Sequence, residues 1–367
     1  MILSSEPGQR TPPPELERAL DLIAAGAAAR DARPDPVFPV EAIVQLEHQG
    51  AMAWNAIPGP VRPPAAAELA LVQAVARADG SVGRIFDGHL NAVERLAVQA
   101  PSALMDRELA AVRAGVVRAG VWGGDPLPGE GPPAAVVGER GKEVLRGVKT
   151  FCSGAGGLHR ALVLARTPAG GPPLSVWIDL TDSRRVEIDE SWYRAHGLRA
   201  SVSHRVVFHD APVLARLRGP GAISEQPWFS RDALRTAASW AGMADSAACS
   251  ALDELAARPQ RGPLEGLASG RILTAQRAIH LWIDAAGRAM DAGAQELPQV
   301  AVQARVAIAD AGAELLETAA RAVGSRPFAR AATLDRARRD LEVFLLQHRL
   351  EPLLARLGET ALSERSR

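Results

Sequence analysis

Cysteine and lysine are both scarce in this sequence of 367 residues. Cys152 and Cys249 are the only two cysteines, and they are too far apart to form a Cys-x-x-Cys metal or redox pair. Two cysteines also make no disulfide framework, which favours a reducing, cytoplasmic environment. Lys142 and Lys149 are the only lysines among 42 basic residues. Because alanine is also abundant, we interpret the excess of arginine as coding bias and give single arginines little weight.

The sequence also lacks an excess of charge and a long apolar run. Its formal net charge is +0, which argues against a nucleic-acid partner. The segment from Met1 to Arg10 has no apolar core of the kind that a signal peptide needs. No apolar run approaches the ~20 residues of a membrane span. We therefore expect a cytoplasmic protein that acts without a nucleic-acid or membrane partner.

Several common catalytic motifs are missing. The sequence has no Gly-x-x-x-x-Gly-Lys-[Ser/Thr] phosphate loop and no Gly-x-Ser-x-Gly nucleophile turn. His204 and His209 lie on one predicted strand, but an odd step separates them, so they point to opposite faces. They cannot share a metal ion there, and we expect no metal site.

Composition divides the chain into three parts. Helix-forming residues dominate before Gly115 and after Gly221, whereas valine, glycine, proline and threonine dominate between them. The sequence thus predicts a mixed, mainly α fold. We expect an N-terminal helical domain (1–118), a central β-barrel-like domain (119–220) and a C-terminal four-helix bundle (221–367).

Hydrophobic periodicity and turn residues predict the elements within these parts. Helices are expected over 14–29, 39–54, 65–78, 83–100, 230–257 and 270–292, and strands over 134–137, 144–152, 162–165, 174–180 and 201–208. The strand ending at Phe208 is expected to close at Asp210–Pro212. A heptad-like seam follows through Val302, Val306, Ala309, Ala313, Leu316, Ala320 and Val323. Arg305 lies off that seam, on a face that we expect to be solvated.

One glycine-rich stretch, from Gly147 to Gly157, contains the pattern Gly-x-Lys-x-[aromatic]-x-[Ser/Thr]. Lys149, Phe151 and Ser153 are its key positions. Further patterns follow at Gly242–Asp245 and Arg258–Gly262, and Leu-x-Arg-x-x-Arg-Asp ends at Asp340. Together, from about Phe38 to Leu357, they resemble the acyl-CoA dehydrogenase family of flavoproteins.

The resemblance implies a cofactor, FAD, and an assembly. Phe151 and Ser153 would lie along the flavin ring, with Cys152 facing away from it. Arg258 would meet the FAD pyrophosphate of a neighbouring subunit, although Arg261 replaces the family's phenylalanine in that motif. Gly324 would lie near the adenine end. A homodimer or homotetramer is implied, together with an electron-transfer partner.

Two departures from the family pattern leave the reaction open. The family's Thr-Glu-x-x-x-Gly-Ser-Asp loop is represented only by Val121–Pro126. The family's catalytic glutamate, eight positions after the Arg-Asp aspartate, is replaced by His348. A few relatives place the carboxylate ten positions before the glycine matched by Gly242, which is Asp232 here.

The resemblance therefore favours an FAD-dependent oxidoreductase that carries out α,β-dehydrogenation of an acyl thioester or a related small molecule, with His348 or Asp232 as the base. A flavin-dependent monooxygenase of the same fold is one alternative, and a binding or assembly subunit without catalysis is another. Each site residue also has a structural interpretation. His348 could be a buried core histidine, Asp232 an acidic residue in the first turn of a helix, and Arg258 a solvated helix-end arginine.

Overall fold

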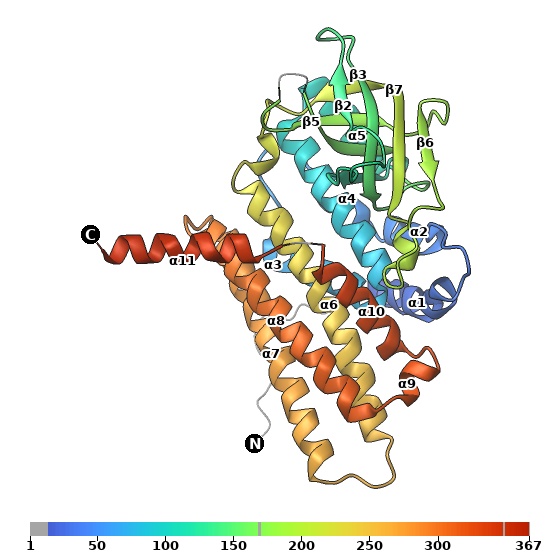
Figure 1. Cartoon of the computed structure of the whole chain (residues 1–367), viewed down its shortest axis with the longest axis vertical. Coiled ribbons are helices and arrows are strands. Elements are labelled where there is room, and N and C mark those ends of the chain that lie inside the picture. Colours follow the sequence, from blue (N-terminus) through green and yellow to red (C-terminus); the bar gives the residue numbers. More distant parts are fainter. Residues whose placement is uncertain (1–13, 168–169, 348, 367) are drawn as a thin grey trace.

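A computed structural model describes residues 14–167, 170–347 and 349–366 (Figure 1). The N-terminal part is helical. Asp79 caps one of these helices, since its carboxylate accepts the N–H groups of Ser81 and Val82 at 2.9 and 3.1 Å. The helices are α1 (Pro14–Asp31), α2 (Val40–His48), α3 (Ala65–Ala78), α4 (Gly80–Gln99) and α5 (Ser102–Arg113).

Helix α4 occupies the centre of the molecule. It runs between the sheet and the C-terminal helices in Figure 1, and nearly all of its side chains are buried, including Asp87, His89, Glu94 and Arg95. Buried polar side chains need partners inside the protein. The partners of α4 therefore mark where the rest of the chain meets it.

Seven strands form one sheet within the described residues, in the order β1-β4-β5-β7-β3-β2, with β6 paired to β7. The β1–β4 pair is parallel and the other pairs are antiparallel. Isolated bridges join Gly124 to Thr150 and Ala135 to Arg166, so the sheet curls towards a barrel. The strands are β1 (Ala119–Trp122), β2 (Ala135–Val137), β3 (Val144–Cys152), β4 (Arg160–Ala165), β5 (Leu174–Asp179), β6 (Val186–Asp189) and β7 (His204–Arg216).

The C-terminal part is a helical bundle. Gly242 lets α6 touch α3, because a Cβ atom there would collide with the carbonyl of Gln73 and lie 2.8 Å from the nitrogen of Arg77. The helices are α6 (Trp228–Ala256), α7 (Pro263–Asp291), α8 (Leu297–Val323), α9 (Arg326–Ala329), α10 (Thr333–Leu345) and α11 (Glu351–Arg365). Helix α11 extends away from the body in Figure 1. Among the described helices, none is long and apolar enough to cross a membrane.

The structure corrects several sequence-based expectations. Arg305 is buried rather than solvated, because its guanidinium stacks on Trp240 of α6. The buried stripe of α8 runs through Ala304, Ile308 and Leu315, not along the predicted seam, apart from Leu316. Strand β7 continues past the predicted stop at Asp210–Pro212, since Ala211 and Pro212 still pair with β3 and the segment from Val213 to Arg216 pairs with β5.

Candidate functional site

The C-terminal end of β3 is hydrogen-bonded to the segment that follows β1. The amino group of Lys149 is buried and donates to Oδ1 of Asp125 at 2.8 Å and to the carbonyl of Gly123 at 3.2 Å. The hydroxyl of Thr150 donates to the carbonyl of Asp125 at 3.1 Å. Lys149 therefore holds the strand end in place, and it does so from the interior of the protein.

Phe151 has an unusual backbone. Its φ is 53°, in the left-handed region that bulky residues rarely adopt, and the β3–β7 pairing shifts register between Lys149 and Cys152. The Phe151 ring is 52% exposed and meets the edge of Trp192 at 4.9 Å between centroids. Cys152 enters the core, and burial raises the pKa of its thiol. The strained turn thus presents an aromatic ring to the surface.

Ser153 lies directly beyond that turn, within a cluster of hydroxyl groups. Its Oγ is 2.9 Å from Oγ of Ser203, which is 2.8 Å from Oγ of Ser201. The Ser153 carbonyl accepts the indole N–H of Trp122 at 3.1 Å. All three serines are buried. Sequence reasoning identified Ser153 but not Ser201 or Ser203, because they come from a loop that no local pattern links to β3.

The loop that carries those serines is clamped by the Leu-x-Arg-x-x-Arg-Asp motif. Oδ1 of Asp340 accepts the N–H of Leu198 at 2.6 Å, and Arg339 bonds to the carbonyl of His196. Leu198 and Val202 both have positive φ, at 51° and 43°. Burial raises the pKa of Asp340 to about 7. The motif therefore maintains a strained loop beside Ser153.

Tyr193 supports the same loop from the other side. Its hydroxyl donates to the carbonyl of Gly197 at 3.2 Å, and burial raises its pKa to about 12. Hydrogen bonding to Ser201 and Ser203 counteracts part of that rise in the Tyr193 pKa. The phenol therefore stays protonated near neutral pH and donates a hydrogen bond to the Gly197 carbonyl.

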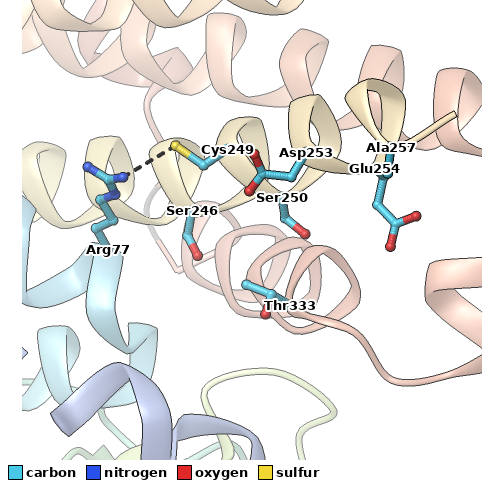
Figure 2. Close-up of a pocket in the computed structure, with 8 residues that line it drawn as sticks. All are labelled: Arg77, Ser246, Cys249, Ser250, Asp253, Glu254, Ala257 and Thr333. Atoms are coloured by element: carbon cyan, nitrogen blue, oxygen red, sulfur yellow. Dashed lines mark hydrogen bonds between the residues drawn. The ribbon is translucent and has the colours of Figure 1, made fainter. Parts of the chain in front are cut away.

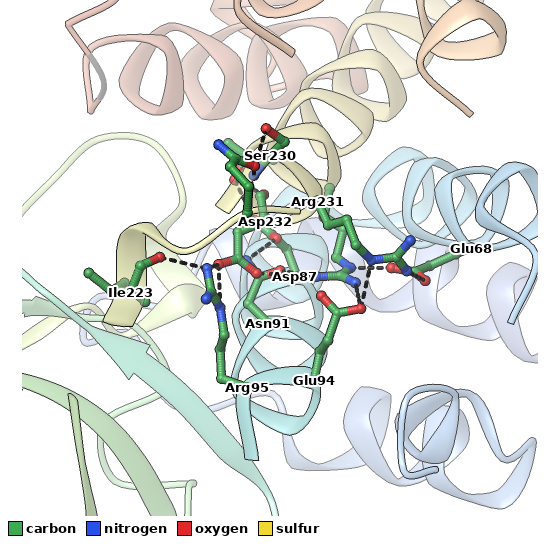
Figure 3. Close-up of polar contacts among 12 residues, drawn as sticks. Glu68, Asp87, Asn91, Glu94, Arg95, Ile223, Ser230, Arg231 and Asp232 are labelled. Atoms are coloured by element: carbon green, nitrogen blue, oxygen red, sulfur yellow. Dashed lines mark hydrogen bonds and ion pairs between the residues drawn. The ribbon is translucent and has the colours of Figure 1, made fainter. Parts of the chain in front are cut away.

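Asp232 lies at the start of α6 and is bound by arginines (Figure 3). Its Oδ2 accepts hydrogen bonds from Nε and Nη2 of Arg95 at 2.9 and 2.5 Å, and its Oδ1 accepts one from Nη1 of Arg235 at 3.3 Å. Burial raises the pKa of Asp232 to about 6, although the two arginines oppose that rise. Arg95 also donates to the carbonyls of Ala222 and Ile223, which ties α4 to the segment before α6.

A second ionic cluster lies deeper, between α3, α4 and α6 (Figure 3). Arg231 donates to Glu68 at 2.9 Å and to Glu94 at 2.7 Å, and Arg235 pairs with the same two carboxylates. Their side chains are at most 6% exposed. Two arginines and two glutamates thus compensate one another where three helices meet.

The remaining predicted residues are separate from these groups. Arg258 donates to Glu265 at 2.8 Å and to the carbonyls of Ala322 and Val323, beside Gly324. The structure therefore brings Arg258 and Gly324 together, with the guanidinium engaged at the end of α8. His348 lies outside the described residues.

His89 belongs to the core. Its Nε2 lies 2.7 Å from the carbonyl of Met52, and its Nδ1 accepts the N–H of Ala119 at 3.0 Å. The second contact fixes the neutral tautomer, with the proton on Nε2. Burial lowers the pKa of His89 to about 4.

A groove of about 410 Å³ lies along α6, away from these residues (Figure 2). Nη2 of Arg77 donates to Sγ of Cys249 at 3.4 Å there. The groove is lined by Arg77, Ser246, Cys249, Ser250, Asp253, Glu254, Ala257 and Thr333. Among the described residues, no group of three or more histidine, cysteine or acidic side chains could hold a metal ion.

The strand end fits a planar, amphipathic ring better than a charged group. The exposed ring of Phe151 and the half-buried ring of Trp192 offer apolar surface, and the Ser153 hydroxyl offers a neutral donor and acceptor. These features suit the isoalloxazine of a flavin. The Arg258 guanidinium, which the resemblance assigned to a pyrophosphate, is bonded here to Glu265 and to the end of α8.

No protein-family model and no curated protein matches the sequence. Solved structures do match. KijD3 with FMN and dTDP-3-amino-2,3,6-trideoxy-4-keto-3-methyl-D-glucose is 22% identical, with a TM-score of 0.79 over 93% of this chain and 92% of that one. Methanesulfinate monooxygenase MsuC from Pseudomonas fluorescens is 20% identical, with a TM-score of 0.81 over 96% and 97%. A steroid acyl-CoA dehydrogenase is 16% identical, with a TM-score of 0.74 over 96% and 98%. The chain has the acyl-CoA dehydrogenase fold, as the sequence motifs predicted.

Proposed function

We propose that this protein is a flavin-dependent monooxygenase that acts on a small molecule and uses FMN. One observation carries the choice of reaction. Both carboxylate oxygens of Asp232 are engaged by the guanidinium groups of Arg95 and Arg235. A base for α-proton removal needs a free oxygen within reach of the substrate. Asp232 is therefore held as an ion-pair partner of Arg95 and Arg235, which argues against Asp232 as the base of a dehydrogenation. The other base that the sequence suggested, His348, lies outside the described residues.

The cofactor preference follows from Arg258 and from the comparisons. FAD carries a pyrophosphate that needs cationic donors, and the Arg258 guanidinium is already bound to Glu265 and two carbonyls. FMN carries only one phosphate. KijD3, whose fold this chain shares, was solved with FMN. These points support FMN over the FAD of the sequence-based hypothesis.

Reduced flavin supplies two electrons to dioxygen, so that one oxygen atom enters the substrate and the other leaves as water. The chain's own residues would position the flavin ring and handle the protons of the reaction. Phe151 would cover one face of the ring, and the Ser153 hydroxyl would hydrogen-bond its polar edge. Ser203 and Ser201 continue from Ser153 as a line of hydroxyl groups that can hold or pass a proton.

Flavin titration tests the proposal first. We expect the protein to quench FMN fluorescence on binding and to bind FAD more weakly. Ser153→Ala removes one hydrogen bond, so FMN affinity should fall about 5- to 10-fold, which corresponds to roughly 1 kcal/mol. Ser363→Ala, on exposed α11, is the matched control and should leave affinity unchanged. A protein that takes up neither flavin would support the binding-subunit alternative instead.

The reaction type needs a second measurement. Acyl thioesters added without oxygen should leave the bound flavin oxidised, since the Asp232 carboxylate is ion-paired with Arg95 and Arg235. Reduced FMN with oxygen should be reoxidised and yield hydrogen peroxide when no substrate is present. Bleaching of the flavin by an acyl thioester would reinstate the dehydrogenase.

We also propose self-association, with Arg258 near the subunit boundary. The outward face of α7 exposes Leu264, Leu267 and Leu281 at 77%, 54% and 50%. None of the described residues of α11 is buried within its own chain. Apolar surface of this kind commonly lies against a partner. A monomer across the micromolar range in light scattering would exclude it.

A further inference from the structure

Arg305, on α8, is buried, and two of its three guanidinium nitrogens have no hydrogen-bond acceptor among the described residues. The residue is 6% exposed, and its guanidinium lies 5.3 Å from the ring centroid of Trp240. Within the part of the chain that the structure describes, Nε and Nη2 of Arg305 are buried and find no hydrogen-bond partner. A buried charge is costly unless it is paired. This guanidinium therefore needs an anion that the described residues do not supply.

The surroundings of Arg305 have an excess of positive charge. Trp240 meets Phe344 edge to face at 6.0 Å, and Arg84 stacks over Phe344 at 5.3 Å. Asp87 is the nearby carboxylate, but it lies 3.6 Å from Arg84 and is hydrogen-bonded by Asn91 and Thr236. Burial lowers the pKa of Arg305 to about 10, which still leaves it charged near neutral pH. Two guanidinium groups thus face one carboxylate.

We propose that the Nε–Nη2 edge of Arg305 binds the acid group of a small organic anion, such as a carboxylate, sulfinate or sulfonate. Those two nitrogens form the fork that pairs with two oxygens of one acid group. The indole of Trp240 covers the flat face of the guanidinium, so an acid group would have to bind along the buried edge.

The site is connected to the groups described above through α6. Asp232, Thr236 and Trp240 follow one another at steps of four, so they share one face of that helix. Eight residues of helix span about 12 Å. If the anion site holds the substrate, this inference rests on the proposed function. The substrate of the proposed oxygenation would then be a small organic acid.

Thermal unfolding without flavin tests the anion site on its own. We would measure Tm in rising methanesulfonate and acetate, with dimethyl sulfone and acetamide as neutral counterparts and chloride to match ionic strength. Anions that bind the folded state raise Tm with concentration. We expect methanesulfonate or acetate to raise Tm of the unmodified protein, and the neutral compounds to leave it unchanged.

The decisive variant is Arg305→Met, which keeps the stem but removes the charge. Without anions its Tm should equal or exceed that of the unmodified protein, because a buried, unpaired charge has been removed. The anion-dependent rise should disappear in Arg305→Met, shrink in Arg305→Lys and persist in the exposed control Arg271→Met. An equal rise in Arg305→Met and the unmodified protein, or no rise in either, would overturn the proposal. So would a lower Tm for Arg305→Met, which would show that Arg305 is a structural partner of Asp87.

The outcome separates this site from the proposed function. Anion stabilisation that depends on Arg305, in a protein that binds no flavin, would keep the anion site and reject the monooxygenase. Flavin binding without Arg305-dependent stabilisation would keep the proposed function and reject the anion site.

Discussion

Asp340 on α10 accepts the backbone N–H of Leu198 at 2.6 Å, across 142 residues of sequence. Gly80 makes room for this carboxyl group, since a Cβ atom there would lie 2.7 Å from its Oδ2. Asp79 at the N-cap of α4, Asp31 on α1 and Arg336 on α10 are the charged groups that act on it. One carboxyl group thus ties α10 to the loop that carries Ser201 and Ser203, next to the first residue of α4.

Asp340 should make the protein less stable as the pH rises. Its pKa is about 7 when folded against 3.8 for the ordinary value, so the folded state retains a proton that the unfolded state releases. The stabilising contribution is complete below about pH 4 and is lost as the pH rises through 7. A shift of about three pKa units corresponds to roughly 4 kcal/mol at most. Asp340→Asn keeps an acceptor for Leu198, so urea unfolding from pH 5 to 8 should show a flatter profile. The exposed control Asp253→Asn should leave the slope unchanged.

His89 should act in the opposite direction over much of the same range. Its pKa is about 4 when folded and 6.5 ordinarily, so the unfolded state gains a proton first as the pH falls. The contribution is complete above about pH 6.5 and is lost as the pH falls through 4, by roughly 3 kcal/mol. His89→Gln should therefore lose less stability between pH 7 and pH 4.5, as measured by urea unfolding. The exposed control His209→Gln should behave like the unmodified protein, and an equal acid sensitivity in His89→Gln would contradict the assignment.

Glu68→Gln should strongly destabilise the fold. The change leaves Arg231 and Arg235, whose side chains are 6% and 0% exposed, short of one negative charge. Removing one partner of a buried ion pair costs about 3–5 kcal/mol. Glu317 pairs with Arg321 at 2.5 Å on the surface, so Glu317→Gln should cost at most about 0.5 kcal/mol. Equal losses in urea unfolding would mean that the buried cluster is solvated.

Gly242→Ala should also destabilise, through overpacking. The added methyl group would collide with the carbonyl of Gln73, so α3 and α6 would have to move apart. Such changes cost about 1–3 kcal/mol or more. Gly266 is a helical glycine with nothing within 4 Å of an added Cβ, so Gly266→Ala should stabilise by about 0.5–1 kcal/mol. A Tm for Gly242→Ala that matches or exceeds that of the unmodified protein would refute the close contact.

Elements with strong local patterns were predictable from the sequence. The helix expected over 65–78 is α3, because Pro64 and Asp79 set its ends. Strands β1 and β6, of four residues each, were missed, since so few residues show no clear alternation. Arg305 was assigned to solvent because its position relative to Trp240 depends on how two helices pack, which periodicity within one helix does not specify. The domain boundaries at 118/119 and 220/221 stay predictions.

The candidate site was predictable only where its residues are neighbours in sequence. Phe151 and Ser153 belong to one local pattern, whereas Ser201, Ser203 and Asp340 reach Ser153 through contacts between distant segments. Counting along the chain selected Asp232 but could not show that Arg95, 137 residues away, binds it. The roles of Phe151, Ser153, Asp232, Arg258, Gly324 and His348 stay proposals.

The ionic cluster between α3, α4 and α6 has a consequence for synthesis of the chain. Glu68 finds Arg235 after 167 residues, and Glu94 finds Arg231 after 137. At ~5–20 residues per second, the ribosome takes roughly 7–30 s to make the segment between the second pair. During that interval α3 and α4 have emerged without the helix that neutralises and covers them. The nascent N-terminal part therefore cannot complete its fold until the whole β domain has been translated. A chaperone would bind the chain during this interval.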